Sequence, residues 1–437
     1  MGSREGAASL NRTSRLRLQT SCTQLVLVDI YLRVEMDAAS YSGREMATPQ
    51  MLWVCVMVDC AYYRGIRFRP LSSFHHLHQT FINTGLIEKR LGYQLPDQAS
   101  TDTMANTAEH TVKSFEIRNF AFENGTVLPS AKLCYLDLNP TFSKTALVIT
   151  CFRGRLQSTL NFADGALKDH RVIVVALFGN GESSSPSNAD FPDAVRYTDC
   201  VRAQKELLIS HLGLQSVDVV LGFSMGGQCT YHWSVMYPDF VRNAVIICSS
   251  ARTSKHNYQF LEGPKAALET AFDFVDKSLA PSSSEPSRGI RAFGKAYSAW
   301  LTSAEWFDEE QYKKLGYENL EDWDIDITWK GYTGWAPEDL LIMLRMWQAG
   351  DISNAVSSID KSLESALSSI KARVLLMPCE TDQYFRPGPN EREARSIPSV
   401  TLEVIPSIWG HVAGSGASPA DKEWMDKKVS AFLDAAR

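Results

Sequence analysis

The amino-acid sequence predicts an α/β fold with a mostly parallel sheet, helices on both faces and a helical cap insertion. From about residue 106, short apolar runs rich in β-branched residues alternate with segments of helical periodicity, a pattern typical of strands joined by crossover helices. The alternation stops after Ser250 and resumes at Arg373, and residues 251–370 between them read as helical. A serine flanked by glycines stands between one apolar run and the next helical segment. The insertion should therefore cover the edge of the sheet at which ligands bind.

Composition and charge exclude several classes of protein. The chain has 437 residues, 44% of them hydrophobic, and a formal net charge of −6, which suits a large globular domain with a sizeable core. Lysine and arginine do not cluster on a periodic segment, so we expect no nucleic-acid partner. No uninterrupted apolar run reaches about 18 residues, so we expect no membrane span.

The nine cysteines are scattered along the chain, and most of them lie inside apolar runs. They predict buried thiols in a cytoplasmic, reducing environment, and neither a disulfide framework nor a metal site. The arginine-rich start of the chain weakly resembles an organellar transit segment. A disordered basic start is the alternative.

Residues 1–105 form an N-terminal extension for which the sequence predicts no structure. This part has an apolar patch at 51–58 but no sustained periodicity. Three interpretations stay open: a poorly ordered extension, a small appended element, or sequence upstream of a natural start at Met104. We expect residues 106–437 to form the α/β domain, with the cap at about 251–370.

The first elements of this domain are a hairpin and a series of strands. The pair Asn124-Gly125 favours a tight turn and marks the tip of the hairpin. A helix ahead of the glycine-flanked serine places Val201, Leu208 and Leu212 on one face. The expected ranges are 111–122 and 131–138 for the hairpin, 146–150, 172–178, 217–223 and 244–248 for further strands, and 197–212 for the helix.

The cap and the last elements follow. The cap is rich in tryptophan, and these side chains either form a helical core or line a wall for an acyl chain. Strands return at 373–378 and 400–405, and a closing helix carries Met425, Val429 and Phe432 on one face. The cap tryptophans are Trp300, Trp306, Trp323, Trp329, Trp335 and Trp347.

Ser224 lies in the sequence GFSMG, at residues 222–226. The expected strand 217–223 precedes it, and a helix at 227–237 follows. A strand, a sharp turn and a helix make the geometry of a nucleophile elbow. The serine must adopt a strained backbone conformation there, and side chains at Gly222 and Gly226 would collide across the turn. The pattern predicts that Ser224 is a nucleophile.

A serine nucleophile needs a base, and the base needs an acid to orient it. Asp382 follows the strand at 373–378, and His411 follows the strand at 400–405, so all three residues stand just beyond strand ends in the order Ser, Asp, His. Alone, His411 could be a solvated loop histidine and Asp382 a turn residue. Glu380 is a rival acid on the same loop, but the shorter side chain at 382 favours Asp382.

An acyl-transfer site also stabilises an oxyanion, which two backbone N–H groups usually do. We expect these from Met225, at the start of the helix after the nucleophile, and from Phe152, in the loop after the strand 146–150. In that loop, Arg153 and Arg155 could bind a substrate anion such as a carboxylate or a coenzyme phosphate. The alternative is that they brace the loop through salt bridges.

From about residue 108 onward the chain resembles the homoserine O-acetyltransferase-like branch of the α/β-hydrolase superfamily, particularly fungal members linked to acyl or polyketide transfer and hydrolysis in secondary metabolism. The stretches that carry the resemblance are 222–228 (GFSMGGQ), 248–257 (CSSARTSKHN), 262–267 (EGPKAA) and the loops of Asp382 and His411. The resemblance implies an α/β-hydrolase fold and a catalytic triad of Ser224, Asp382 and His411. Residues 151–155 (CFRGR) depart from the Cys-His-Ala-Leu type loop of homoserine acetyltransferases, which weakens a homoserine-specific assignment.

The expected function is acyl transfer through an acyl-enzyme, from a thioester or ester to an alcohol or to water, in secondary metabolism. A small molecule is the substrate, and acyl-CoA or a carrier-protein thioester, with its acyl carrier domain as partner, could supply the acyl group. We expect no bound cofactor and no metal. The alternatives are a non-catalytic ligand-binding protein of the same fold and a plain carboxylesterase or thioesterase.

Overall fold

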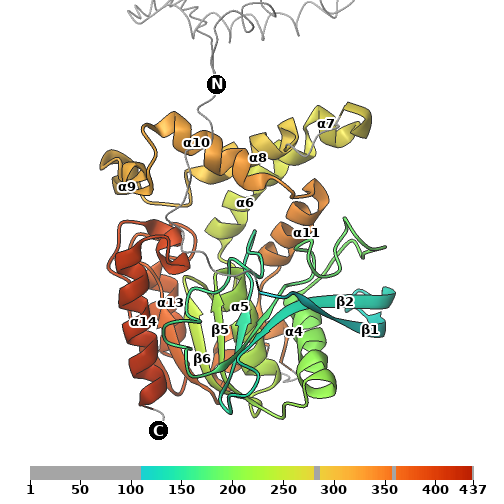
Figure 1. Cartoon of the computed structure of the whole chain (residues 1–437), viewed down its shortest axis with the longest axis vertical. Coiled ribbons are helices and arrows are strands. Elements are labelled where there is room, and N and C mark those ends of the chain that lie inside the picture. The colour runs from blue at the N-terminus through green and yellow to red at the C-terminus, as the bar shows by residue number, and fades with distance from the viewer. Residues whose placement is uncertain (1–109, 280–285, 357–360, 436–437) are drawn as a thin grey trace, which may run out of the picture. The chain divides into compact units, whose positions relative to one another are not determined.

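The computed structural model describes residues 110–279, 286–356 and 361–435 (Figure 1). The predicted N-terminal extension at 1–105 lies outside the described residues. Eight strands form one sheet in the order β1-β2-β4-β3-β5-β6-β7-β8. Their bounds are β1 Lys113–Ala121, β2 Val127–Leu138, β3 Thr145–Ile149, β4 Arg171–Val175, β5 Val217–Phe223, β6 Val241–Ile247, β7 Arg373–Met377 and β8 Val400–Leu402.

The sheet is antiparallel at one edge and parallel elsewhere. β1 and β2 form the predicted hairpin, in which Gly125 adopts a φ of 88°, and β2 also pairs antiparallel with β4. All further pairs, from β4 through β8, are parallel. In these pairs Gly222 lies opposite Ile149, and Ile247 lies opposite both Phe223 and Met377. The carboxyl ends of β3, β5, β6 and β7 therefore meet at one edge.

Helices cover both faces of the sheet, because alternate residues of each strand point to opposite sides. On β3, Leu147 packs in the apolar cluster that contains Cys229 of α5, whereas Val148 packs in the cluster that contains Val429 of α14. The predicted fold class is thus confirmed. The helices outside the cap are α4 Tyr197–Glu206, continued by the π-helical turn Leu207–His211, α5 Met225–Met236, α13 Pro387–Ala394 and α14 Pro419–Asp434.

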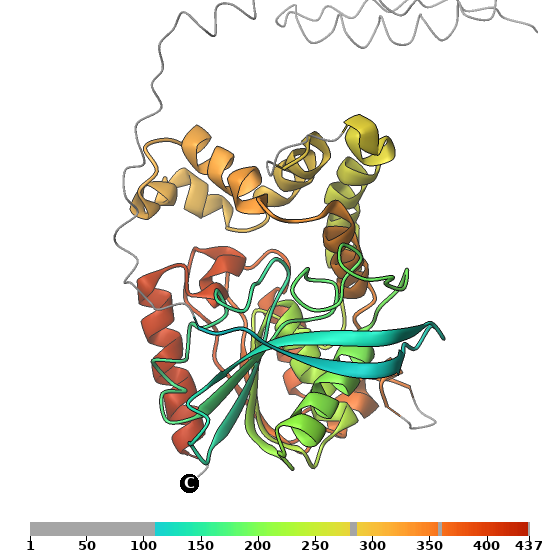
Figure 2. The same ribbon diagram turned by 45° about the vertical axis from the view of Figure 1, so that its right-hand side comes forward.

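The chain between β6 and β7 is helical. Figures 1 and 2 show α8 and α10 in a separate layer above the sheet, with α6 and α11 running between that layer and the sheet. The α-helices are α6 Lys255–Glu269, α7 Phe272–Val275, α8 Arg288–Ser298, α9 Ala304–Asp308, α10 Leu320–Thr328, α11 Pro337–Gln348 and α12 Leu363–Ser368. Short 3-10 turns accompany them: η2 Lys277–Leu279, η3 Gln311–Leu315, η4 Lys330–Tyr332 and η5 Ile352–Asn354. We refer to this segment as the cap.

Two tryptophans of the cap belong to different apolar clusters. Trp347 packs against Phe385 in the cluster that holds α5, with ring centroids 5.6 Å apart. Trp306 packs against Trp409 in the cluster that holds α14, with ring centroids 6.0 Å apart. These aromatic side chains therefore join the cap to the loops beyond the strands, which favours the helical-core interpretation for Trp306 and Trp347.

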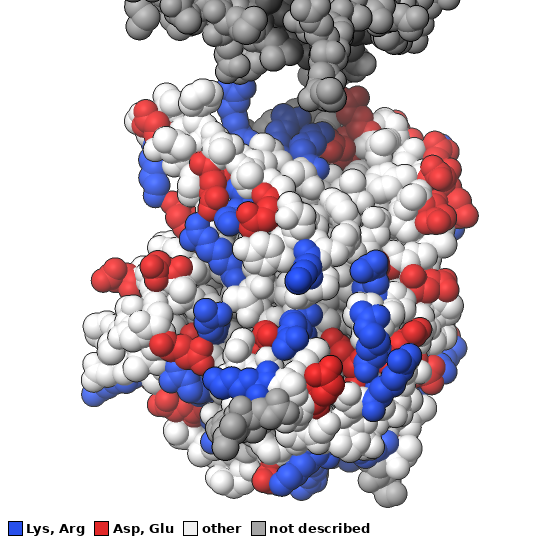
Figure 3. Space-filling view, turned by 180° about the vertical axis from the view of Figure 1, so that it is seen from behind, with Lys and Arg blue, Asp and Glu red and all other residues white. Residues whose placement is uncertain are grey.

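Surface charges are mixed on one face (Figure 3), the cysteines form no disulfides, and no helix could span a membrane, all within the described residues. On the face opposite to that of Figure 1, lysine and arginine side chains lie among aspartate and glutamate (Figure 3). The six cysteines of the described ranges are free, and five of them are buried. Among helices within those ranges, none has the length and apolar character needed to cross a membrane.

Candidate active site

Ser224 occupies a sharp turn between β5 and α5. Its φ of 57° and ψ of −122° define a backbone conformation that residues other than glycine rarely adopt. The neighbouring strand supports it, since the Ser224 N–H donates to the carbonyl of Ile247 at 2.9 Å. The Ser224 carbonyl accepts from the Ser249 hydroxyl at 2.7 Å and from the Gln228 N–H at 3.1 Å. The strained backbone is thus held from both sides.

The two glycines of the turn are required for different reasons. A Cβ atom at Gly222 would lie 2.1 Å from the carbonyl carbon of Gly226, which is the collision across the turn that the sequence predicts. A Cβ atom at Gly226 would lie 2.4 Å from the carbonyl oxygen of Ile149. The second conflict is therefore with the end of β3. The absence of a side chain at Gly226 lets α5 pack directly against that strand.

Replacing Gly226 with alanine should destabilise the fold. We expect the free energy of unfolding to fall by about 2–3 kcal/mol, because the added methyl group meets backbone that cannot rotate away. Urea denaturation followed by circular dichroism measures the change. Gly263→Ala in α6 is the control, since its added Cβ meets nothing within 4 Å apart from its chain neighbours. The strain of placing alanine before Pro264 offsets the gain of about 1 kcal/mol that alanine gives in a helix, so we expect a small net change. Equal stability of the two variants would contradict the steric argument.

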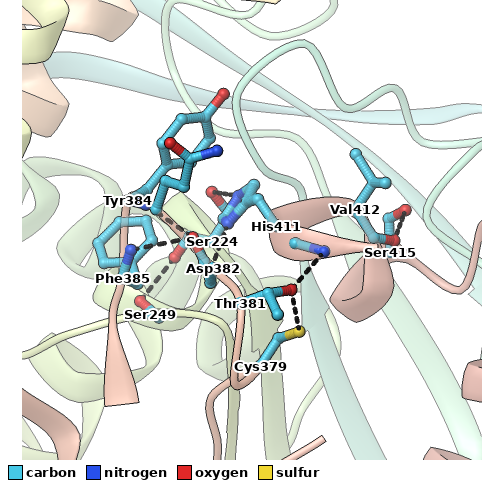
Figure 4. Close-up of polar contacts among 12 residues, drawn as sticks. Ser224, Ser249, Cys379, Thr381, Asp382, Tyr384, Phe385, His411, Val412 and Ser415 are labelled. Carbon is cyan, nitrogen blue, oxygen red and sulfur yellow. Dashed lines mark hydrogen bonds and ion pairs between the residues drawn. The ribbon is translucent and has the colours of Figure 1, made fainter. Parts of the chain in front are cut away.

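His411 and Asp382 complete a chain of hydrogen bonds that begins at Ser224 (Figure 4). His411 lies in the 3-10 turn η6 Gly410–Ser415, and its Nε2 atom is 2.9 Å from the Ser224 Oγ atom. Its Nδ1 atom is 2.8 Å from the Oδ2 atom of Asp382. The Oδ1 atom of Asp382 accepts from the N–H groups of Tyr384 at 2.7 Å and Phe385 at 3.1 Å. The side chains of Ser224, His411 and Asp382 are all buried.

Packing fixes the His411 ring in place. Its centroid is 4.8 Å from that of Phe223 and 4.5 Å from that of Tyr384. The turn that carries it is anchored on the acid loop, because the Gly410 N–H donates to the Thr381 hydroxyl at 3.1 Å. His411 is therefore not a solvated loop histidine.

The rival acid Glu380 and the histidine of α5, His232, lie elsewhere. Glu380 is exposed, and its backbone N–H pairs with the carbonyl of Ile405. His232 is buried in α5 with its Nδ1 atom 2.7 Å from the carbonyl oxygen of Gln228, and burial lowers its pKa to about 4. Neither residue joins the hydrogen-bonded chain of Ser224.

Met225 and Phe152 lie near Ser224. Met225 is the first residue of α5, so its N–H is one of the four at a helix start that have no carbonyl partner within the helix. Phe152 follows β3 and lines the same cavity as Ser224. These positions are compatible with an oxyanion hole, and that role stays a prediction.

Arg153 and Arg155 contact the cap. The Arg153 guanidinium donates to the carbonyl of Gly331 at 2.6 Å and lies 3.7 Å from the ring centroid of Tyr332. Arg155 donates to the carbonyl of Gly334 at 3.2 Å and lies 3.7 Å from the ring centroid of Trp335. The two arginines brace the loop against the cap as the alternative interpretation has it, but through carbonyls and aromatic rings and not through salt bridges.

The two arginines differ in their position relative to the cavity. Arg153 lines the cavity beside Ser224, whereas Arg155 donates to the carbonyl of Asn180 at the side. Binding of a substrate anion by either residue stays a prediction.

A cavity of about 350 Å³ opens beside Ser224 and His411. Its wall is mostly apolar, with Phe162, Leu301 and Val412 among the lining residues, and Tyr297 of the cap also faces it. Within the ranges that the structure describes, no group of three or more histidine, cysteine, aspartate or glutamate side chains is arranged to hold a metal ion. The site thus combines a serine hydroxyl, an imidazole hydrogen-bonded to it and an apolar space of small-molecule size.

Sequence reasoning assigned no role to Ser249 or Thr381. Ser249 stands two residues beyond β6, and Thr381 precedes the acid by one residue. A small hydroxyl side chain just past a neighbouring strand is a weak signal for a residue that holds the backbone of the site. The hydrogen-bond partners of such a side chain depend on which strands are neighbours in the sheet, and the sequence alone does not give this order.

Comparisons with known proteins identify the family of the chain. Residues 147–413 match the family model of the alpha/beta hydrolase fold. Ethyl acetate hydrolase of Pseudomonas veronii is 32% identical over 336 residues, which cover 73% of this chain and 95% of that protein. The solved structure of the acetyl esterase MekB superposes with a TM-score of 0.68 at 30% identity, over 74% of this chain and 97% of that one. Homoserine O-succinyltransferase of Marinobacter nauticus is 28% identical, over 54% of this chain and 64% of that protein.

Proposed function

Because the chain belongs to the alpha/beta hydrolase fold family, we propose that it is a serine hydrolase that cleaves small carboxylic esters through an acyl-enzyme. Ser224 is the nucleophile, His411 the general base and Asp382 the acid that orients it. The observation that carries the proposal is the buried chain of hydrogen bonds from Ser224 Oγ through His411 to Asp382. A non-catalytic binding protein would have no need of this alignment.

The mechanism follows from these contacts. His411 Nε2 removes the proton of the Ser224 hydroxyl as Oγ attacks the ester carbonyl carbon. The carbonyl oxygen becomes an oxyanion, which the N–H groups of Met225 and Phe152 stabilise. Collapse of the intermediate expels the alcohol, which takes the proton from His411. Water, activated by His411 in the same way, then releases the acid and restores Ser224.

The substrate is an oxygen ester with a short acyl group. The names of the ethyl acetate hydrolase and the acetyl esterase support this choice, since both relatives align over more than nine-tenths of their length. The apolar cavity of about 350 Å³ is at the lower end of ligand-sized pockets, which suits a small ester.

Acyl transfer is a second candidate, favoured by the likeness to homoserine O-succinyltransferase. In this alternative the same acyl-enzyme passes its acyl group to an alcohol. The donor is then a thioester of acyl-CoA or of a carrier protein, as the expected role in secondary metabolism requires. Transfer and hydrolysis use the same residues and differ in whether the cap excludes water until an acceptor binds.

Product partition separates these functions. We expect the protein to hydrolyse p-nitrophenyl acetate faster than the octanoate, and to give acetate as the main product even when homoserine or a simple alcohol is added. Chromatography of the products measures the partition. Conversion of most acetyl groups to a new ester, or faster consumption of acetyl-CoA, would favour the transferase. An absence of turnover with every ester and thioester would favour the binding protein.

A further inference from the structure

Two polar side chains of α13 are buried although the helix is short and lies outside the proposed triad. α13 begins at Pro387, two residues after Phe385, whose N–H holds Asp382. Asn390 is 0% exposed and Glu393 is 5% exposed, and they stand three residues apart on one face of the helix. Burying an amide and a carboxyl group is costly unless both are hydrogen-bonded. Their partners therefore indicate what the helix is built to hold.

Both residues bond to the segment that follows β6, and one residue of that segment contacts Ser224. The Asn390 Nδ2 atom donates to the carbonyl of Ser249 at 2.8 Å, and Ser249 in turn donates its hydroxyl to the carbonyl of Ser224 at 2.7 Å. The Oε1 atom of Glu393 accepts from the Ala251 N–H at 3.0 Å. Asn390 is thus connected to the turn of Ser224 through Ser249 alone, and Glu393 holds the same segment two residues further along, at Ala251.

Glu393 also binds the helix that follows the nucleophile. Its Oε2 atom accepts from the Tyr231 hydroxyl of α5 at 2.8 Å, and the Tyr231 side chain is fully buried. One carboxyl group therefore joins three elements: α13 with the acid loop before it, the chain after β6, and α5. These elements carry Asp382 and Ser224, which no direct contact links.

We propose that Glu393 is a positioning residue, which keeps the Ser224 turn aligned with the acid loop and so with His411. The inference rests on the proposed function, because alignment matters for a reaction at Ser224. Removing the carboxyl group leaves the Ala251 N–H and the Tyr231 hydroxyl without an acceptor and frees residues 249–251 to shift. A displacement of about 1 Å at a reacting atom can cost on the order of a hundredfold in rate.

The test compares Glu393→Ala with Glu393→Gln. The glutamine can accept from Ala251 and donate to Tyr231, so we expect it to keep kcat within threefold. We expect Glu393→Ala to lower kcat by about 10- to 100-fold with KM within twofold, and to slow labelling of Ser224 by a fluorophosphonate probe to the same extent. Asp199→Asn is the matched control, because Asp199 is also a buried carboxylate that accepts from two backbone N–H groups, those of Arg196 at the start of α4 and of Glu123 in the β1–β2 turn. Its labelling rate should be that of the wild-type protein.

Tyr231→Phe provides a milder variant in case Glu393→Ala does not fold. It removes one of the two hydrogen bonds to Glu393 and leaves the other, so we expect a loss of kcat of about threefold, again with KM unchanged. A folded Glu393→Ala or Tyr231→Phe protein with the wild-type kcat and labelling rate would overturn the proposal.

The pH dependence of stability supplies a readout that is independent of turnover. Burial raises the pKa of Glu393 from 4.5 to about 7, while it faces the Tyr231 hydroxyl of α5, Arg392 on its own helix and Arg252 beyond β6. Because the folded state holds this proton more tightly than the unfolded state, stability should fall as pH rises from 4.5 to 7. Subtracting the melting temperatures of Glu393→Gln isolates this contribution. A pH-independent difference would place Glu393 in another environment and contradict the proposal.

Failure of the proposed function would look different. In that case the wild-type protein would neither hydrolyse esters nor react with the fluorophosphonate. The low-field proton resonance of His411 Nδ1, which needs no turnover, then decides the inference. We expect Glu393→Ala to shift or broaden it and Asp199→Asn to leave it unchanged, and an unchanged resonance in both would overturn the positioning role.

Discussion

Ser224→Ala is expected to lower kcat for p-nitrophenyl acetate by at least about a thousandfold, with the protein fully folded. The alanine keeps the backbone of the turn, whose hydrogen bonds to Ile247, Ser249 and Gln228 all involve main-chain atoms of residue 224. What it removes is the Oγ atom that forms the acyl-enzyme. Steady-state kinetics and intact-protein mass spectrometry after fluorophosphonate treatment measure the two consequences.

Ser234→Ala is the matched control for this variant. Ser234 is buried in the same helix, α5, where its hydroxyl donates to the carbonyl of Thr230 within the helix. We expect wild-type kcat and complete labelling from it. Labelling of Ser224→Ala, or turnover close to that of Ser234→Ala, would show that another residue is the nucleophile.

Asp382→Asn is expected to lower kcat by about a thousandfold or more, although the side chain hardly changes in size. The Oδ1 position accepts from two backbone N–H groups, those of Tyr384 and Phe385, so the amide oxygen must remain there. The amide nitrogen then faces His411 Nδ1 and donates to it. This arrangement places the imidazole proton on Nε2, which can no longer accept the proton of Ser224.

Glu380→Gln tests the rival acid on the same loop. Glu380 is exposed, so we expect this variant to keep the wild-type kcat. The pH profile separates the two cases further, because the loss in Asp382→Asn reflects a wrong tautomer and should persist at every pH at which the protein is folded. Equal losses in the two variants would remove Asp382 from the orienting role.

The pattern of strands in the sequence was sufficient to predict that Ser224, Asp382 and His411 lie close together. The predicted strand 217–223 has the bounds of β5, and Asp382 and His411 could be predicted because each follows a later strand. The carboxyl ends of parallel strands meet at one edge, so residues far apart in the sequence can be placed near each other without knowledge of side-chain packing.

Other features depend on packing and could not be predicted. Glu393 and Asn390 look like surface residues of a short helix, and their burial follows from how α13 lies against residues 249–251. Arg153 and Arg155 looked available for an anion, because their partners are backbone carbonyls and rings that only the folded cap supplies. Every residue has a backbone carbonyl, so the sequence does not show which carbonyl will accept a hydrogen bond from an arginine.

The hydrogen bond between His411 and Ser224 joins residues 187 positions apart, and the whole cap lies between them in the chain. Contacts of such long range form slowly, because the chain must first lose the entropy of closing a large loop. Reactivity at Ser224 should therefore emerge only after β7 and β8 have docked on the rest of the sheet. A chain in which β7 and β8 have not docked would leave Ser224 without its hydrogen bond to His411, so its hydroxyl would lack a base.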